Sequence, residues 1–177
     1  MEVGRTWGKP MQVGIDVDVV IRRAGETDIP SLLRLMRALA AFEDSSAALR
    51  TNEAILRRDG FGPDPRFGAW LAEIDGRAVG FVSRTVGYSI WAGRSVLALD
   101  DLYVDDAARG LGIGRRLMQA MADECLRDGH AFVRWTVELD NANAIRFYER
   151  LGATLTTKGV CTWLPARMAE GEAEPGR

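Results

Sequence analysis

The sequence predicts a mixed α/β domain with a central twisted sheet of about six to seven strands and helices on both faces. Two features predict this class. The pair Asp75-Gly76 separates two apolar runs and indicates a hairpin, hence antiparallel strands, early in the chain. Later the order becomes strand, helix, strand, helix, which favours parallel neighbours. The predicted element order is β-α-α-β-β-β-α-β-α-β.

The sequence of the N-terminal part of the domain predicts one strand and two helices. The apolar run at 19–21 suits a strand. A cap at Thr27-Asp28 and an early proline, Pro30, begin a helix whose apolar residues recur at helical spacing to about Ala41. A second, shorter helix should cover 51–58 and stop at Asp59-Gly60.

The rest of the domain alternates strands and helices. The predicted elements are strands at 70–74, 78–82 and 95–104, a helix at 112–127, a largely buried strand at 131–139, a short helix at 143–151 and a last strand or hairpin at 154–164. The helix at 112–127 has one apolar face and ends at Asp128-Gly129, because glycine readily takes the left-handed conformation that closes a helix.

Length and charge restrict the domain organisation and the partners. The 177 residues fit one domain at 19–168, flanked by a flexible N-terminal extension at 1–18 and a flexible tail at 169–177. The 23 basic and 25 acidic residues give a net charge of −2, so we expect neither nucleic acid nor a membrane as a partner. A membrane-spanning apolar run and a secretory signal are both missing from the sequence, which favours a cytoplasmic location.

Cysteine and histidine are too few for several kinds of site. Cys125 and Cys161 could form one bridge at most, which argues against a disulfide scaffold and favours a reduced compartment. His130 is the only histidine, so a Cys/His zinc site would lack ligands. A Ser-His-Asp triad would have to include this one residue. We therefore expect no metal, and most hydrolase mechanisms are disfavoured.

A glycine-rich segment between a strand and an amphipathic helix is the first candidate site. The segment runs Arg109-Gly110-Leu111-Gly112-Ile113-Gly114-Arg115. Its glycines allow close backbone approach, and the N–H groups at the helix start favour phosphate oxygens. The segment lacks the Gly-Lys-Ser/Thr of a Walker A loop and the third glycine of the dinucleotide fingerprint. The pattern fits either a pyrophosphate site or a purely structural turn.

Two signatures in this sequence resemble those of the GNAT superfamily of acyl-CoA-dependent N-acetyltransferases. Arg109-x-x-Gly112-x-Gly114 looks like the Arg/Gln-x-x-Gly-x-Gly/Ala signature, and Asn141-x-x-Ala144-x-x-Phe147-Tyr148-Glu149-x-x-Gly152-Ala153 resembles the second one. The resemblance spans about Val19 to Leu164. It implies a GNAT-like fold in which the fourth and fifth strands splay apart. It also implies acetyl transfer to an amine by direct attack in a ternary complex, with acetyl-CoA as the co-substrate.

A narrower resemblance is to the diamine acetyltransferases, which include spermidine/spermine acetyltransferases. It is carried by Ala41-Phe42-Glu43, Asp59-Gly60-Phe61-Gly62, Trp91-Ala92-Gly93 and Leu99-Asp100-Asp101. The sequence departs from that family at Asp100, where Glu is common, and at Asp44-Ser45, which replace an aromatic-acidic continuation. The resemblance implies a small diamine or polyamine as the acceptor and a homodimer.

The resemblance also assigns roles to residues. It implies that the CoA pyrophosphate sits over Gly110 to Arg115, that the pantetheine arm runs beside Leu102 to Val104, and that Tyr148 protonates the leaving thiolate. It implies that Asn141 holds the CoA from the far side of the cleft. The implied cofactor-binding residues are Leu102, Tyr103, Val104, Arg109, Gly110, Leu111, Gly112, Ile113, Gly114, Arg115, Asn141 and Tyr148.

The acceptor amine needs a base, because most of it is protonated at neutral pH. Asp100 and Asp101, acidic residues in an otherwise apolar strand, are the best candidates for binding the cation and accepting its proton. Alternation along the strand should turn only one of them to the cleft, unless a bulge intervenes. Glu43 is a further residue expected to bind the substrate, and Glu43 and water are the other candidate bases. Trp91 either packs or forms a wall of the cleft beside an aliphatic chain of the substrate.

Two other functions are compatible with the sequence. The acceptor could be another amine: an amino acid, an aminoglycoside or a protein amino group. The domain could instead bind acyl-CoA without catalysis. Tyr148 and Asn141 argue against the second possibility, since a pure binding module needs the glycine turn and not the acid.

Overall fold

The structure, a computed structural model, describes residues 17–165. These residues form two compact units divided between Thr136 and Val137, and each unit is described by itself. The predicted extension, apart from its last two residues, and the predicted tail lie outside the described residues. Within residues 17–165, no helix is long and apolar enough to cross a membrane.

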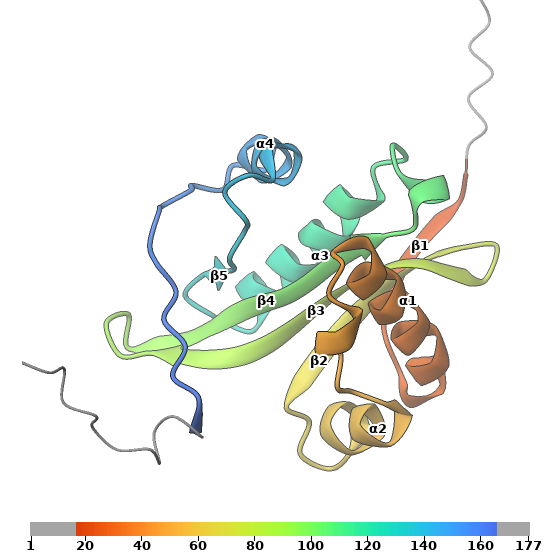
Figure 1. Cartoon of the computed structure of the whole chain (residues 1–177), viewed down its shortest axis with the longest axis horizontal. Helices are drawn as coiled ribbons and strands as arrows, with labels where there is room; N and C mark the ends of the chain where they lie inside the picture. Colours follow the sequence, from red (N-terminus) through yellow and green to blue (C-terminus); the bar gives the residue numbers. More distant parts are fainter. Residues whose placement is uncertain (1–16, 166–177) are drawn as a thin grey trace, which may run out of the picture. The chain divides into compact units, whose positions relative to one another are not determined.

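The first unit contains a five-stranded sheet in the order β1-β2-β3-β4-β5 (Figure 1). The strands are β1 Val19–Arg23, β2 Phe67–Ile74, β3 Arg77–Ser89, β4 Arg94–Val104 and β5 Val133–Arg134. The first four are antiparallel to their neighbours, and β5 runs parallel to β4. Asp75-Gly76 forms the turn between β2 and β3, with both φ angles positive, so the predicted hairpin is confirmed.

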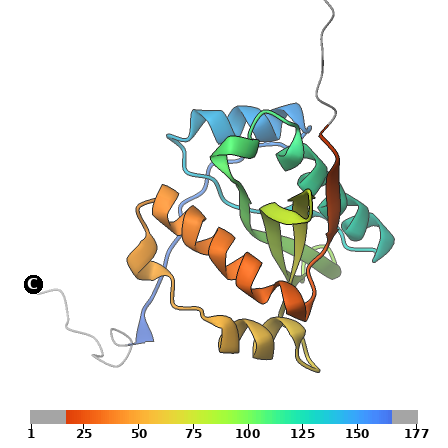
Figure 2. The same cartoon turned by 90° about the vertical axis from the view of Figure 1, so that its right-hand side faces the viewer.

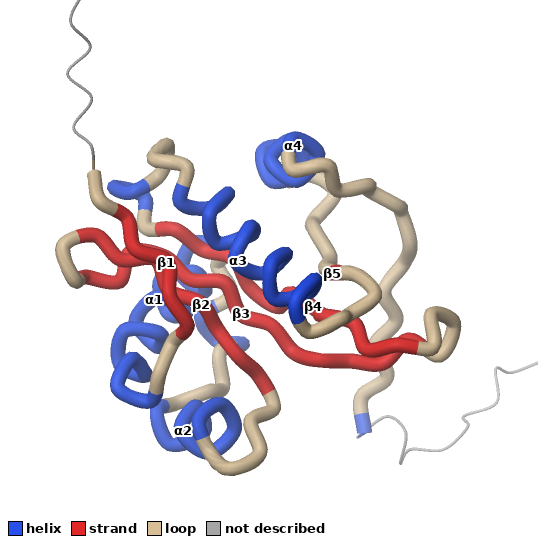
Figure 3. The backbone as a smooth tube through the Cα atoms, turned by 180° about the vertical axis from the view of Figure 1, so that it is seen from behind, coloured by secondary structure: helices blue, strands red, loops and turns tan. Residues whose placement is uncertain are grey.

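Three helices cover the sheet of the first unit, and a fourth lies in the second unit. They are α1 Ile29–Phe42, α2 Glu53–Phe61 and α3 Ile113–Arg127, with α4 Ala142–Arg150 in the second unit. Figure 3 shows α3 in front of the strands and α1 and α2 behind them, and Figure 2 shows the same separation of α1 and α3 from the side. The predicted mixed α/β architecture with helices on both faces is confirmed.

Alternation along β2 and β3 divides the core between the two faces. Leu71 of β2 and Phe81 of β3 are fully buried in the apolar cluster that includes Leu32 and Leu35 of α1. The side chain next to Leu71, Trp70, points instead to α3, where it bonds to Glu124. In residues 67–72 of β2 and 80–85 of β3, before the register shift at Ala72/Glu73, odd-numbered residues therefore face α1 and even-numbered residues face α3.

The predicted strand count was too high. The described residues form five strands, β5 has two residues instead of the predicted 131–139, and 154–164 form no strand. Apolar and β-branched residues favour strands, but a strand exists only where a second backbone pairs with it. Only Leu97 and Ala98 of β4 pair with β5, and the side chains of Val160 and Trp163 are exposed.

The second helix was predicted to stop too early. It continues through Asp59-Gly60 to Phe61, because Phe61 packs with Ile29, Leu33 and Leu56. The glycine serves close packing instead of helix termination, since a Cβ at Gly60 would lie 2.3 Å from the ring of Phe67.

Candidate active site

The glycine segment makes a sharp turn that ends in the first turn of α3. Gly110 and Gly112 have φ angles of 82° and 74°, in the left-handed region where side chains are strained. The first intrahelical bond runs from Arg116 N to Gly112 O at 3.1 Å. The N–H groups of 113–115 precede that bond, so the helix start has donors and a positive dipole end available for an anion. The donor set fits a pyrophosphate group.

Arg109 faces the protein beside this turn. Its Nε donates to the carbonyl of Val104 at 3.2 Å, and its Nη2 pairs with Asp106 Oδ1 at 2.8 Å. Its guanidinium carbon lies 4.7 Å from the ring centroid of Phe42 and 5.9 Å from that of Tyr103. Arg109 therefore ties the glycine turn to β4 and to the end of α1. Its role in cofactor binding stays a prediction.

The fourth and fifth strands separate after two residue pairs, Leu97 with Val133 and Ala98 with Arg134. Past Ala98, within residues 17–136, no strand pairs with β4 on that side. The predicted splay is thus present, and Leu102 to Val104, which we expect beside the pantetheine arm, lie in the separated part. The side chain of Tyr103 is buried in the α1-facing cluster, so this stretch offers its backbone edge.

A β-bulge interrupts β4 at the two aspartates. Val82 pairs with Leu102 and Arg84 pairs with Leu99, so Asp100 and Asp101 together lie opposite the single residue Ser83. Ser83 holds Asp101 by two contacts, both at 3.2 Å: its Oγ accepts the Asp101 N–H and donates to Asp101 Oδ2. The bulge that could bring both carboxylates to one face is therefore present.

The register shows which face the two aspartates share. Ala98 pairs with Thr85, an odd-numbered residue of β3, so Ala98 and the next residue but one, Asp100, belong to the α1 face. Ser83 belongs to the same face and holds the carboxylate of Asp101 there. Both carboxylates thus lie on the side of the sheet that α1 covers.

The environment of the two aspartates favours their neutral forms. Burial, and then the charge of Asp101, raise the pKa of Asp100. Burial raises the pKa of Asp101, although the hydrogen bond from Ser83 opposes this shift. Within residues 17–136, no arginine forms an ion pair with either carboxylate. Each carboxylate is therefore a better proton acceptor than an isolated aspartate.

The other predicted acceptor residues lie elsewhere in the first unit. Glu43 caps the C-terminus of α1, where its N–H donates to Leu39 O at 3.0 Å and its side chain is exposed. Trp91 lies in the turn between β3 and β4 and is fully exposed, at 101%. It therefore packs against nothing described, and its role as a wall for an amine chain stays a prediction.

Two predicted residues belong to α4, in the second unit. Asn141 is the N-cap of this helix: its Oδ1 accepts the N–H of Ala144 at 3.0 Å. Tyr148 lies in the last turn, with its ring centroid 5.2 Å from that of Phe147. Burial raises the pKa of the Tyr148 phenol, so this group holds its proton at neutral pH. Its role as the acid stays a prediction.

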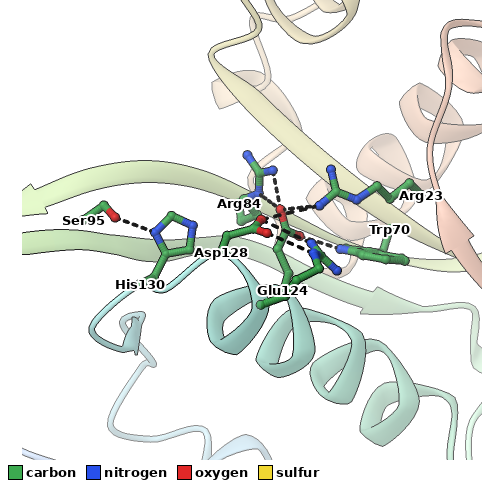
Figure 4. A network of polar contacts seen from close by, with 8 residues as sticks. Arg23, Trp70, Arg84, Ser95, Glu124, Asp128 and His130 are labelled. Carbon is green, nitrogen blue, oxygen red and sulfur yellow. Dashed lines mark hydrogen bonds and ion pairs between the residues drawn. The ribbon is translucent and has the colours of Figure 1, made fainter.

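A buried carboxylate on α3 was not predicted from the sequence. Glu124 is 1% exposed and accepts bonds from Trp70 Nε1 at 2.8 Å and Arg84 Nη2 at 2.5 Å, and pairs with Arg23 Nη2 at 2.8 Å (Figure 4). Burial alone would raise the pKa of Glu124, but the bonds from Arg84 and Trp70 outweigh it and hold the pKa below its usual value. The position of Glu124 on the helix face of Leu117 and Met121 could have revealed it.

The described residues contain no group of three or more His, Cys, Asp or Glu side chains that could hold a metal ion. The candidate site of the first unit consists of the three features described above: the glycine turn, the separated edge of β4 and the two aspartates of the bulge. It combines donors for an anion with carboxylates for a cation.

The sequence matches the model of the Acetyltransferase (GNAT) family over residues 32–153. The thialysine N-epsilon-acetyltransferase of Mus musculus is 39% identical over 163 residues, covering 86% of this chain and 93% of the mouse protein. The spermidine/spermine N(1)-acetyltransferase-like protein 1 of Homo sapiens is 34% identical over 140 residues, covering 75% of this chain and 20% of the human protein.

Solved structures show the same fold. An aminoglycoside acetyltransferase from an uncultured soil metagenomic sample, in complex with trehalose, superposes with a TM-score of 0.71. The match covers 82% of this chain and 95% of that chain at 20% sequence identity, so it supports the fold and not the acceptor.

Proposed function

Because the chain belongs to the GNAT family of acetyltransferases and is an N-acetyltransferase, we propose that its acceptor is the primary amine of a small diamine or polyamine. The observation that carries this proposal is the bulge in β4, which gathers Asp100 and Asp101 on one face opposite Ser83. Two neighbouring carboxylates that form no ion pair within residues 17–136 suit a ligand with more than one positive charge.

The acetyl donor in this proposal is acetyl-CoA, which supplies an acetyl thioester. Its pyrophosphate would bind the N–H groups at the start of α3, from Gly110 to Arg115, where the exposed side chains of Arg115 and Arg116 add positive charge. The backbone edge of Leu102 to Val104 would bind the pantetheine arm, and Asn141 would also bind CoA.

The reaction needs two proton losses at the nitrogen and one proton gain at the sulfur. Asp100, exposed at the bulge, would accept the proton of the ammonium group, directly or through water, while Asp101 keeps its charge beside the substrate. The freed nitrogen bonds to the acetyl carbon as the carbon–sulfur bond breaks. Tyr148 would give its proton to the departing sulfur and regain one, through water, from the nitrogen, which loses a second proton to become an amide. Glu43 and Trp91 would contact the rest of the amine.

A panel of amines tests the acceptor. Free-thiol release from acetyl-CoA is measured with diamines, polyamines, monocationic amines, amino acid amides, a peptide and thialysine. Diamines and polyamines should give the highest kcat/KM, and rising salt should reduce that preference because it screens charge pairing. A monocationic amine or a peptide that is faster than every diamine would contradict the proposal.

Thialysine is a second acceptor class, favoured by the mouse relative that is 39% identical and named for it. The same panel separates the two classes. A thialysine kcat/KM above that of every diamine would assign the acceptor to an amino acid with a side-chain amine.

A further inference from the structure

Ser83 is the one side chain that holds the bulge in β4 from the opposite strand. It is buried, at 7% exposure, and sits between Val82 and Arg84, whose β4 partners mark the two ends of the bulge. Its hydroxyl contacts Asp101 twice, accepting from the backbone N–H and donating to Oδ2, each at 3.2 Å. One hydroxyl therefore fixes both the backbone and the carboxylate of the same residue.

The bulge creates the need for this hydroxyl. An extra residue in one strand leaves a backbone group without its partner in the ladder. The oxygen of Ser83 accepts the N–H of Asp101 in place of a β3 carbonyl. An alanine at this position would leave a half-buried N–H without an acceptor and a half-buried carboxylate without a donor.

The hydroxyl also chooses which of the two carboxylates is fixed. Asp101 is bound by Ser83, whereas Asp100 is exposed and receives no bond from Ser83. A carboxylate that accepts a hydrogen bond is favoured in its charged form. The two aspartates therefore differ in freedom and in ease of protonation, although they are neighbours in one strand.

We propose that Ser83 is a positioning residue for the acceptor amine: it fixes Asp101 as the anion that binds the cationic substrate and leaves Asp100 to exchange the proton. The inference rests on the proposed function for the identity of the acceptor, and on the bulge geometry alone for the effect on Asp101.

Few other groups act on Asp101. On its face, β2 places Ala69 opposite Ser83, and α1 contributes leucines to the cluster there. The charged neighbour in the bulge is Asp100, whose own pKa is raised by the charge of Asp101. Removing the hydroxyl should therefore raise the pKa of Asp101, since the opposing burial remains.

The first test needs no substrate. The carboxyl pKa of Asp101 is measured by NMR titration in the full chain, in Ser83→Ala and in Ser83→Thr. The pKa should rise in the alanine variant and return toward the original value in the threonine variant, which keeps the hydroxyl. An unchanged pKa in Ser83→Ala would overturn the positioning role, whatever the acceptor is.

The second test uses the best amine of the panel. Ser83→Ala should raise the KM for that amine about tenfold, leave the KM for acetyl-CoA unchanged, and move the acidic limb of kcat/KM to higher pH. Ser83→Thr should restore all three. Ser95→Ala is the matched control, because Ser95 bonds His130 Nδ1 at 2.8 Å and lies with Tyr88 on the other face.

Equal rises in both KM values, or an unmoved acidic limb, would overturn the inference. If Ser83→Ala does not fold, Ser83→Cys retains the volume with a weaker donor and should shift the limb in the same direction by less. A titration that behaves as expected while diamines are poor substrates would refute the proposed acceptor and leave the role of Ser83 intact.

Discussion

Each face of the sheet holds carboxylates whose pKa values are shifted, in opposite directions on the two faces. On the α3 face, Glu124 is surrounded by Arg23, Trp70 and Arg84, and its pKa is lowered. On the α1 face, Asp100 and Asp101 face each other's charge with one hydroxyl as a donor, and their pKa values are raised. Burial pushes all three pKa values upward. The number of donors and cations decides the final direction.

The difference separates a structural carboxylate from a reactive one. Glu124 stays charged over the working pH range and joins β1, β2 and β3 to α3, so it stabilises the sheet. The aspartates of the bulge gain and lose protons more easily and can bind a cation. Variants on each face should therefore affect different properties: stability on the α3 face and acetyl transfer on the α1 face.

The largest expected effect is on the α3 face. Glu124→Gln removes the charge that the buried guanidinium of Arg84 pairs with, so the free energy of unfolding should fall by about 3 kcal/mol. The measurement is urea unfolding, with kcat measured on the folded enzyme. The kcat should be nearly unchanged, because the acceptor amine and the reacting groups are expected at the bulge on the α1 face and not beside Glu124.

Asp123→Asn is the control for this prediction, since Asp123 is an exposed carboxylate of the same helix. It should change the unfolding free energy by less than about 0.5 kcal/mol. A loss of activity in Glu124→Gln at full stability would contradict the division between the two faces.

The second effect concerns Tyr148, a proposed proton donor that belongs to neither of the two carboxylate regions. Tyr148→Phe removes the hydroxyl with little change of shape, and kcat should fall about a hundredfold when chemistry is rate-limiting. The KM for the amine should stay unchanged. Tyr88→Phe, which removes an exposed phenol in β3, is the matched control. A decrease of less than severalfold would make Tyr148 structural.

The third effect is at the bulge. Asp100→Asn removes charge without volume, so the KM for a diamine should rise about tenfold while the KM for acetyl-CoA stays the same. If Asp100 is also the proton acceptor, kcat should fall as well, and most at lower pH, where more of the amine is protonated. Steady-state kinetics with Asp123→Asn as the control measure both. Equal effects on the two KM values would refute an acceptor-side role.

Local signals predicted the elements that lie beside the site. The hairpin at Asp75-Gly76 is a two-residue turn, whose residues alone specify the conformation. The start of α3 follows from Gly112, which takes the left-handed φ needed at the N-cap of this helix. The GNAT resemblance, carried by residues around the same turn, is confirmed by the family match over 32–153.

Features that depend on a distant partner could not be predicted. The bulge at Asp100 exists only in the register with Ser83, and periodicity within β4 cannot show that register. The function of Glu124 depends on arginines from β1 and β3 that are far away in the sequence. The length of β5 depends on where β4 stops pairing with it. The apolar run at 131–139 does not show this point, so the strand predicted from it was too long.

The smallest expected effect is in the pH dependence of stability, where the two faces should have opposite signs. The folded-state pKa of Glu124 lies below its usual 4.5, so its contribution is present above that value and is lost as pH falls through the lowered pKa. The folded-state pKa values of Asp100 and Asp101 lie above 3.8, so the folded state binds more protons there than the unfolded state. Their contribution therefore declines as pH rises above that value.

The double variant Asp100→Asn/Asp101→Asn isolates the second contribution. Its unfolding free energy relative to that of the wild type should increase from about pH 4 to about pH 7, because the variant lacks carboxylates that become charged against burial and repulsion. Glu124→Gln should show the reverse slope at lower pH, with its deficit growing as pH rises towards 4.5 and then staying constant, because the wild type gains the charged pair only over that range. Urea unfolding at each pH gives both slopes. Slopes of the same sign would mean that the arginine partners of Glu124, which neither aspartate has within residues 17–136, do not cause the difference between the two carboxylate regions.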